Sequence, residues 1–147
     1  MLADFQQAMA DMVASPQLCN TVRRTPDTLW RRYTLSTLEY RRLVEIAGNH
    51  GMNGHCALYR VDRFAPLALH LPELCRGLRE VLPRLVEEYW TEHPRTDVNA
   101  LLECDRFCRF LRAKEAKGWA MPAELRTAFE HEHGEVQMKL ALNCTIL

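Results

Sequence analysis

Apolar residues recur along this chain at steps of three and four positions, in segments that proline and glycine separate. The first segment contains Leu2, Phe5, Met9, Met12 and Val13, which fall on one face of a helix. No alternating run of β-branched residues extends beyond about four positions, and no repeat period is visible. The sequence therefore predicts an all-α fold, a single compact bundle of about seven or eight helices.

Local signals predict where the helices begin. Ser15-Pro16 ends the first helix and starts a second one, over about Pro16 to Arg24. Ser36 and Glu39 have the form of a capping box for the helix that follows them. Later helices are expected to begin near Pro72, Pro83, Thr96 or Asp97, and Pro122.

Other signals predict interruptions. The segment from Thr25 to Leu35 is interpreted as an ordered connection, because proline, threonine and aspartate break its apolar pattern. Gly48 is a natural stop, and the glycine-dense segment from Asn49 to Gly54 predicts a loop and a hinge. Pro66 is expected to bend or restart the next helical stretch.

Length and composition predict one folded domain over residues 1–147, with 48% hydrophobic and 26% charged residues. Nineteen basic residues balance nineteen acidic ones, so the chain has no net charge to attract nucleic acid or an anionic membrane. No apolar run approaches the roughly 20 residues of a membrane span, and the start of the chain does not resemble a signal peptide. We therefore expect a cytoplasmic protein.

The six cysteines are scattered and form no C-x-x-C pair, which favours reduced thiols over disulfides. Cys104 and Cys108 lie four residues apart and share a helix face, where they are interpreted as small core residues. A metal site or a redox pair is the alternative for these two thiols.

Metal binding has weak support from spacing. His50, His55 and Cys56 are close in sequence, but glycines separate the two histidines. Glu130 and His133 match Glu-x-x-His once, whereas a di-iron bundle needs this motif twice. We interpret His131 and His133 as solvated surface residues.

No phosphate-binding loop, dinucleotide fingerprint or hydrolase motif occurs, so we expect no catalytic residues, no metal and no cofactor in this chain.

Arginine gives the most informative pattern. Three doublets stand between residues 21 and 42, and Trp30 and Tyr33 lie among them. Arginine binds carboxylates and phosphates through two hydrogen bonds, and aromatic rings add surfaces on which a peptide stacks.

A second patch, with Tyr59 followed by two arginines, has either a partner-binding role or an internal salt bridge. The predicted partner- or peptide-binding residues are Arg23, Arg24, Trp30, Arg31, Arg32, Tyr33, Tyr59, Arg60 and Arg63, and the alternative for the doublets, which include Arg41 and Arg42, is a solvated face.

Several short motifs occur in a familiar order. They are Phe5-Gln6-Gln7-Ala8, Ala57-Leu58-Tyr59-Arg60-Val61-Asp62-Arg63-Phe64, Leu71-Pro72, Glu88-Tyr89-Trp90, His93-Pro94, Phe107, Phe110-Leu111 and Phe129-Glu130. With these motifs the chain resembles, over nearly its whole length, a bacterial family of unknown function that is often labelled a DNA-binding domain. Asp62 departs from the asparagine of many relatives, and the extra carboxy-terminal domain of longer members is not present in this sequence.

The resemblance implies a function. Members of this family are similar to small companions of a multinuclear non-heme iron oxidase that modifies cysteine in ribosomally made peptides, as in pathways to thiaglutamate-type or methanobactin-type products. The expected function is therefore an accessory subunit that binds the oxidase and helps to present its precursor peptide, with iron held by the oxidase. The alternatives are a DNA-binding transcriptional regulator, in which the arginine doublets contact phosphates, and a small metalloenzyme that uses the histidines and cysteines.

Overall fold

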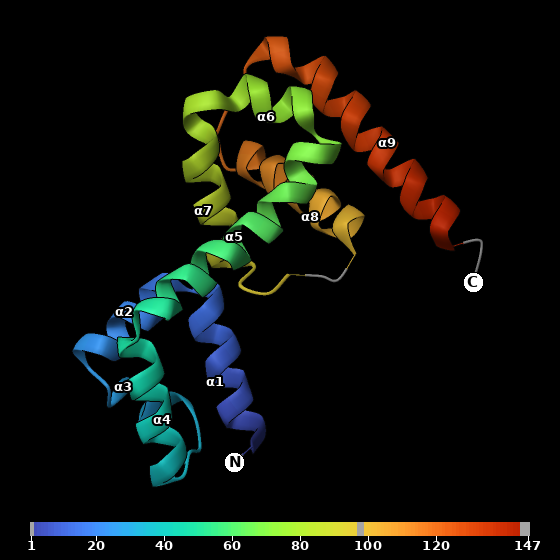
Figure 1. Ribbon diagram of the computed structural model, residues 1–147. Helices are drawn as coiled ribbons and strands as arrows, with labels where there is room; N and C mark the ends of the chain where they lie inside the picture. Colours follow the sequence, from blue (N-terminus) through green and yellow to red (C-terminus); the bar gives the residue numbers. More distant parts are fainter. Residues whose placement is uncertain (1, 97–98, 145–147) are drawn as a thin grey trace. The chain divides into compact units, whose positions relative to one another are not determined.

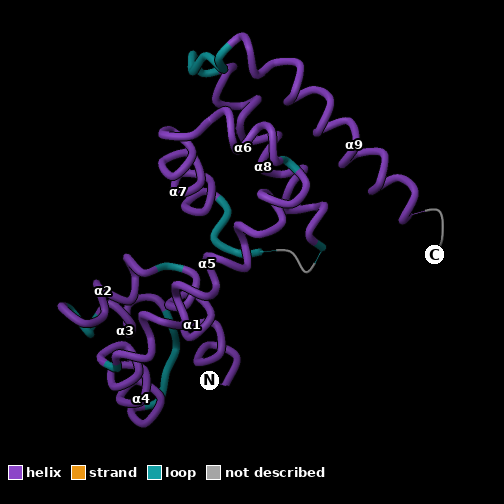
Figure 2. The backbone as a smooth tube through the Cα atoms, turned by 45° about the horizontal axis from the view of Figure 1, so that its top comes forward, coloured by secondary structure: helices purple, strands orange, loops and turns teal. Residues whose placement is uncertain are grey.

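The computed structural model describes residues 2–96 and 99–144 (Figure 1). These residues form helices joined by loops, with no strand among them (Figure 2). The all-helical fold expected from the apolar spacing is confirmed. The chain divides into two compact units, Met1–Val61 and Asp62–Leu147, and the boundary falls within the helix His50–His70. The single domain over residues 1–147 stays a prediction.

The first unit contains four helices and the beginning of a fifth. They are α1 (Leu2–Ala14), α2 (Pro16–Arg24), α3 (Thr28–Arg32), α4 (Thr37–Gly48) and α5 (His50–His70). Helices α1, α2 and α4 contact one another in pairs, and α3 contacts α2. Their buried faces form one core, made of Ala8, Met12, Leu18, Cys19, Val22, Leu29, Leu35, Leu43, Ala47, Met52 and Cys56.

The second unit contains the rest of α5 and four further helices. They are α6 (Pro72–Leu78), α7 (Leu82–Glu92), α8 (Ala100–Ala116) and α9 (Arg126–Cys144), with 3₁₀ turns at Arg79–Val81 and Ala123–Leu125. The most extensive helix contact in this unit joins α8 and α9, and α6 also packs against α9. Tyr89, Phe107 and Phe110 pack their rings together inside the core, with centroids 5.4 to 6.2 Å apart.

Three helices, α2, α4 and α6, begin where the sequence places them, whereas Pro122 precedes a 3₁₀ turn and the last helix begins only at Arg126. The Ser15 hydroxyl accepts a hydrogen bond from the Leu18 amide and caps α2. The capping box of Ser36 and Glu39 is present at α4, and Pro72 opens α6. These signals act within one helical turn, so they are readable without tertiary structure.

Other boundaries differ from expectation. The segment from Thr25 to Leu35 is not only a connection, because it contains α3. Asn99 caps α8, and Thr96 precedes it, so the proposed Thr96 cap is wrong, while Asp97 lies outside the described residues. Helix α5 also continues through Pro66 without a restart.

The glycine loop expected from Asn49 to Gly54 is limited to Asn49, and the chain from His50 to Gly54 is instead the first part of α5. The Asn49 side chain accepts a hydrogen bond from the Gly51 amide, 2.9 Å away, as a helix cap does. Met52 and Cys56, one turn apart, are both buried in the core. Each glycine costs a helix about 1 kcal/mol, and burial of these two side chains outweighs that cost.

Candidate partner-binding surface

An exposed pair of aromatic rings marks the surface of the first unit. Trp30 of α3 stacks on Tyr40 of α4, with ring centroids 4.6 Å apart and planes 17° apart. The Tyr40 hydroxyl donates to Asp27 at the start of α3, 3.3 Å away. Trp30 remains 44% exposed, although large apolar side chains are usually covered. The stack therefore offers a ring face and edge to a partner.

Five exposed arginines lie on α2, α3 and α4 of the first unit. None of the five makes an ion pair with another described residue, and we call them the arginine surface: Arg24, Arg31, Arg32, Arg41 and Arg42. Arg31 follows Trp30 on α3 and Arg41 follows Tyr40 on α4, so each stacked ring has an arginine next to it in the sequence.

The acidic residues of this unit do not neutralise the arginine surface. Met1–Val61 holds seven arginines and five acidic residues, a net charge of +2. Four of these acids accept hydrogen bonds from neutral groups: Asp4 from the Thr34 amide, Asp11 from Tyr33, Asp27 from Tyr40 and Glu39 from Ser36. These four carboxylates therefore connect helices and loops of the first unit, and none of them forms an ion pair with the arginine surface among the described residues.

Two of the predicted binding residues in this unit are engaged internally. Arg23 donates to the Ala47 carbonyl at the end of α4 and to the Asn53 side chain on α5, 2.9 Å away. The Tyr33 hydroxyl donates to Asp11 of α1 at 2.8 Å, and burial together with this carboxylate raises the pKa of Tyr33 to about 12. Both residues join helices of the first unit.

The Tyr59 to Arg63 patch is split by the unit boundary. Tyr59 and Arg60 lie half-buried on the first-unit part of α5, whereas Arg63 belongs to the second unit. Arg63 is only 2% exposed and donates to Glu103 at 2.7 and 2.9 Å, and to the His93 carbonyl at 2.8 Å. For Arg63, the internal salt bridge is the interpretation that the structure supports.

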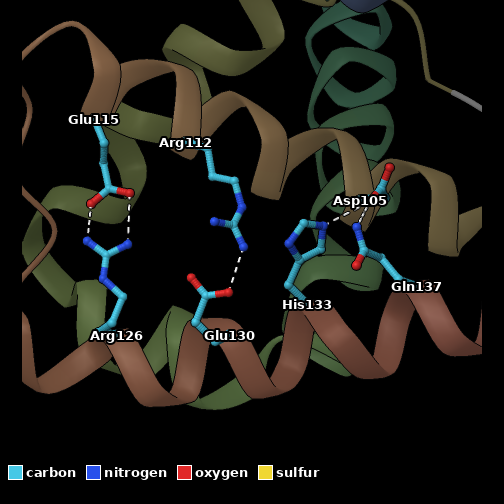
Figure 3. Close-up of polar contacts among 7 residues, drawn as sticks. All are labelled: Asp105, Arg112, Glu115, Arg126, Glu130, His133 and Gln137. Carbon is cyan, nitrogen blue, oxygen red and sulfur yellow. Dashed lines mark hydrogen bonds and ion pairs between the residues drawn. The ribbon is translucent and has the colours of Figure 1, made fainter.

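Polar contacts between α8 and α9 were not apparent in the sequence (Figure 3). Nε2 of His133 donates to Asp105 at 2.8 Å, and both side chains are buried. Burial opposes ionisation, yet the hydrogen bonds from His133 and Arg109 hold the pKa of Asp105 below its ordinary value. The expectation of a solvated His133 is therefore wrong, because its partner lies 28 residues away, whereas His131 is exposed as expected.

A buried carboxylate of α9 caps another helix. Glu132 accepts the amides of Glu73 and Leu74 at 2.8 and 3.0 Å, in the first turn of α6. Amides in the first turn of a helix have no hydrogen-bond partner inside that helix, so the Glu132 carboxylate supplies one. Its negative charge also stabilises the positive end of the helix dipole. The burial of Glu132 is therefore explained by its capping of α6.

Three cysteines of the second unit, Cys75, Cys104 and Cys108, belong to its core or pack against it. Cys104 and Cys108 are fully buried, and burial raises the pKa of the Cys104 thiol to about 12 and that of Cys108 further. Burial and nearby Glu132 raise the pKa of Cys75 to about 11. Such thiols stay protonated at neutral pH and are poor nucleophiles.

Within residues 2–96 and 99–144, no cluster of three or more potential ligand side chains is placed to hold a metal ion. In the same described ranges, no helix combines the length and the apolar character that a membrane span requires. Comparison with protein-family models, with curated proteins and with solved structures gives no match to this chain.

Proposed function

We propose that this chain is a non-catalytic binding protein whose arginine surface takes an acidic segment of a protein or peptide. The observation that carries this proposal is the set of five exposed arginines without an ion pair to any described residue, in the same unit as an exposed Trp30 stacked on Tyr40. A guanidinium binds a carboxylate through two parallel hydrogen bonds, and Trp30 offers flat area at low entropic cost. A carboxylate-rich segment is the complement of this chemistry.

The partner's identity comes from the family resemblance. We propose that the chain binds a multinuclear non-heme iron oxidase and helps to present its precursor peptide, in cysteine-modifying natural product biosynthesis. In this assignment iron belongs to the oxidase, and this chain supplies recognition. An acidic stretch of the oxidase or of the peptide would face the arginine surface.

A peptide titration tests the recognition chemistry. The probe is a fluorescein-labelled peptide of twelve residues in which glutamate alternates with alanine, followed by fluorescence polarisation at low salt. Arg31→Glu/Arg32→Glu is expected to weaken binding about ten-fold or more, because attraction becomes repulsion. The control is Arg76→Glu/Arg84→Glu, the same change of charge at two exposed arginines of the second unit. Equal losses in both variants would exclude the arginine surface as the binding site.

Co-expression tests the proposed partner. The chain should co-purify with the oxidase and raise its turnover of the precursor peptide, and Arg31→Glu/Arg32→Glu should reduce both effects. An oxidase that neither co-purifies nor changes its turnover would rule out this partner while leaving the peptide titration as a separate result.

Duplex DNA is the competing ligand for the same arginines. Phosphate binding by several arginines gives an affinity that falls steeply with salt, because counterions are released. A duplex of twenty base pairs that binds more tightly than the acidic peptide, and does so through Arg31 and Arg32, would support the regulator instead. The small net charge of this unit favours the peptide.

A further inference from the structure

A hollow of about 330 Å³ lies among α1, α4 and the start of α5 in the first unit. Its apolar lining comes from Met9 and Val13 of α1, Ile46 of α4 and Met52 of α5. This volume is at the lower end of the range for ligand pockets and suits one large side chain. Methionine side chains are flexible and polarisable, so they adapt to apolar groups of different shape.

One arginine of the arginine surface, Arg42, lies on the helix α4 that contributes Ile46 to this hollow. Arg42 precedes Ile46 by four residues, and residues with this spacing lie on one face of a helix. Arg42 is exposed, and Glu45, three residues later, makes no ion pair with it in the described part of the chain. The same face therefore combines an apolar recess and a cationic group about one helical turn apart.

We infer that this hollow binds a large apolar side chain of the acidic segment, and that a carboxylate about one turn away in that segment pairs with Arg42. The inference rests on the proposed function and adds a specificity pocket to it. Charge complementarity identifies the occupant, because the first unit carries +2 overall and Arg42 forms no ion pair with any acid in residues 2–96 and 99–144. Anchor side chains of this kind carry much of the free energy of peptide recognition.

Two peptides test the pocket without any change in the protein. Both carry alternating glutamates, and one has phenylalanine and the other serine at the central position. The phenylalanine peptide is expected to bind at least about ten-fold more tightly, because it buries a ring that the serine peptide lacks. Arg42→Gln should weaken both, and Arg76→Gln, at an exposed position of the second unit, is the control.

Methyl resonances locate the bound ring. With ¹³C-methyl methionine, the signals of Met9 and Met52 should shift when the phenylalanine peptide binds, and far less with the serine peptide. Met138 is 57% exposed in the second unit and serves as the control signal. Filling the hollow with Val13→Phe should remove the preference for phenylalanine, and the methyl data remain decisive if that variant folds poorly.

The outcomes separate the pocket from the proposed function. A ten-fold preference together with shifts at Met9 and Met52 supports the pocket. Equal affinities for the two peptides, still dependent on Arg31 and Arg32, overturn the pocket and leave the arginine surface intact. A preference without those methyl shifts places the ring elsewhere and also overturns it. Failure of both peptides to bind overturns the pocket and the recognition of acidic segments together.

Discussion

The two units of this chain use their charges in opposite ways. In Asp62–Leu147, at least eight of the twelve basic residues form ion pairs with other described residues of the unit: Arg63, Arg76, Arg84, Arg109, Arg112, Lys114, Arg126 and Lys139. In Met1–Val61, five of seven arginines are exposed without an ion pair among the described residues. The second unit satisfies its charges internally, whereas the first leaves them available to another molecule.

This difference indicates where stability and recognition reside. Exposed ion pairs contribute about 0–1 kcal/mol each to the free energy of unfolding. Most ion pairs of the second unit are therefore expected to contribute little to its stability. A buried pair such as Arg63 and Glu103 is different, because removing one partner leaves a charge without compensation. The exposed arginines of the first unit have no such ion pair among the described residues, so the binding role proposed above does not compete with the fold for them.

The largest effect is expected at the buried pair. Arg63→Ala should lower the free energy of unfolding by about 3–5 kcal/mol, because Glu103 then stays buried without its partner. Urea unfolding followed by circular dichroism measures the change. The double variant Arg63→Met/Glu103→Leu should recover much of the loss. A loss below about 1 kcal/mol in Arg63→Ala would mean that the pair is not buried in solution.

Glycines of the two units should respond in opposite directions. A Cβ at Gly77 of α6 would stand 1.9 Å from a methyl carbon of Leu125, so Gly77→Ala should destabilise the protein by about 1–3 kcal/mol. Nothing lies within 4 Å of a Cβ at Gly54, so Gly54→Ala should stabilise α5 by up to about 1 kcal/mol. Thermal unfolding distinguishes the two variants. Destabilisation by Gly54→Ala would argue for the loop that the sequence predicted.

Acid should weaken the contact between α8 and α9. The pKa of Asp105 is lower in the folded chain than its ordinary value, so its stabilising effect is complete above about pH 4 and is lost as the pH falls through the folded-state pKa. Wild-type protein should therefore lose more stability than Asp105→Asn between pH 5 and pH 3. Denaturant titrations at several pH values measure this, and parallel curves for the two proteins would contradict it.

The smallest change in stability is expected on the arginine surface. Arg31→Glu/Arg32→Glu should alter the free energy of unfolding by no more than about 0.5 kcal/mol, because neither side chain has an internal ion pair to lose. Equilibrium unfolding in urea provides the value. A loss of 2 kcal/mol would show that these arginines hold the fold, and it would remove the contrast between the units.

The sequence predicts what local signals determine. The starts of α2, α4 and α6 follow from Ser15, Ser36 and Pro72, whose partners lie within one turn. The loop that the sequence predicted between Asn49 and Gly54 is wrong, because side chains of this segment are buried against other helices, and their burial overrides the glycine signal. Long-range packing also decides which apolar side chains of one helix are buried: in α4, Leu43 is fully buried, whereas Leu38 is 57% exposed.

The candidate site was also only partly predictable from the sequence. The arginine doublets and Trp30 are visible in the sequence, but their engagement is not, because Arg23 binds groups 24 and 30 residues away. Arg63 meets Glu103 across 40 residues, so no local pattern separates it from an exposed arginine. A doublet predicts a basic region, and only the fold determines which members remain available.

A charge-swap titration tests the central claim most directly. Wild-type chain, Arg31→Glu/Arg32→Glu and Arg76→Glu/Arg84→Glu are each titrated with the alternating glutamate peptide and with its lysine counterpart. We predict that only Arg31→Glu/Arg32→Glu exchanges its preference, losing the glutamate peptide and gaining the lysine peptide. Unchanged affinity of this variant for the glutamate peptide would contradict recognition by the arginine surface.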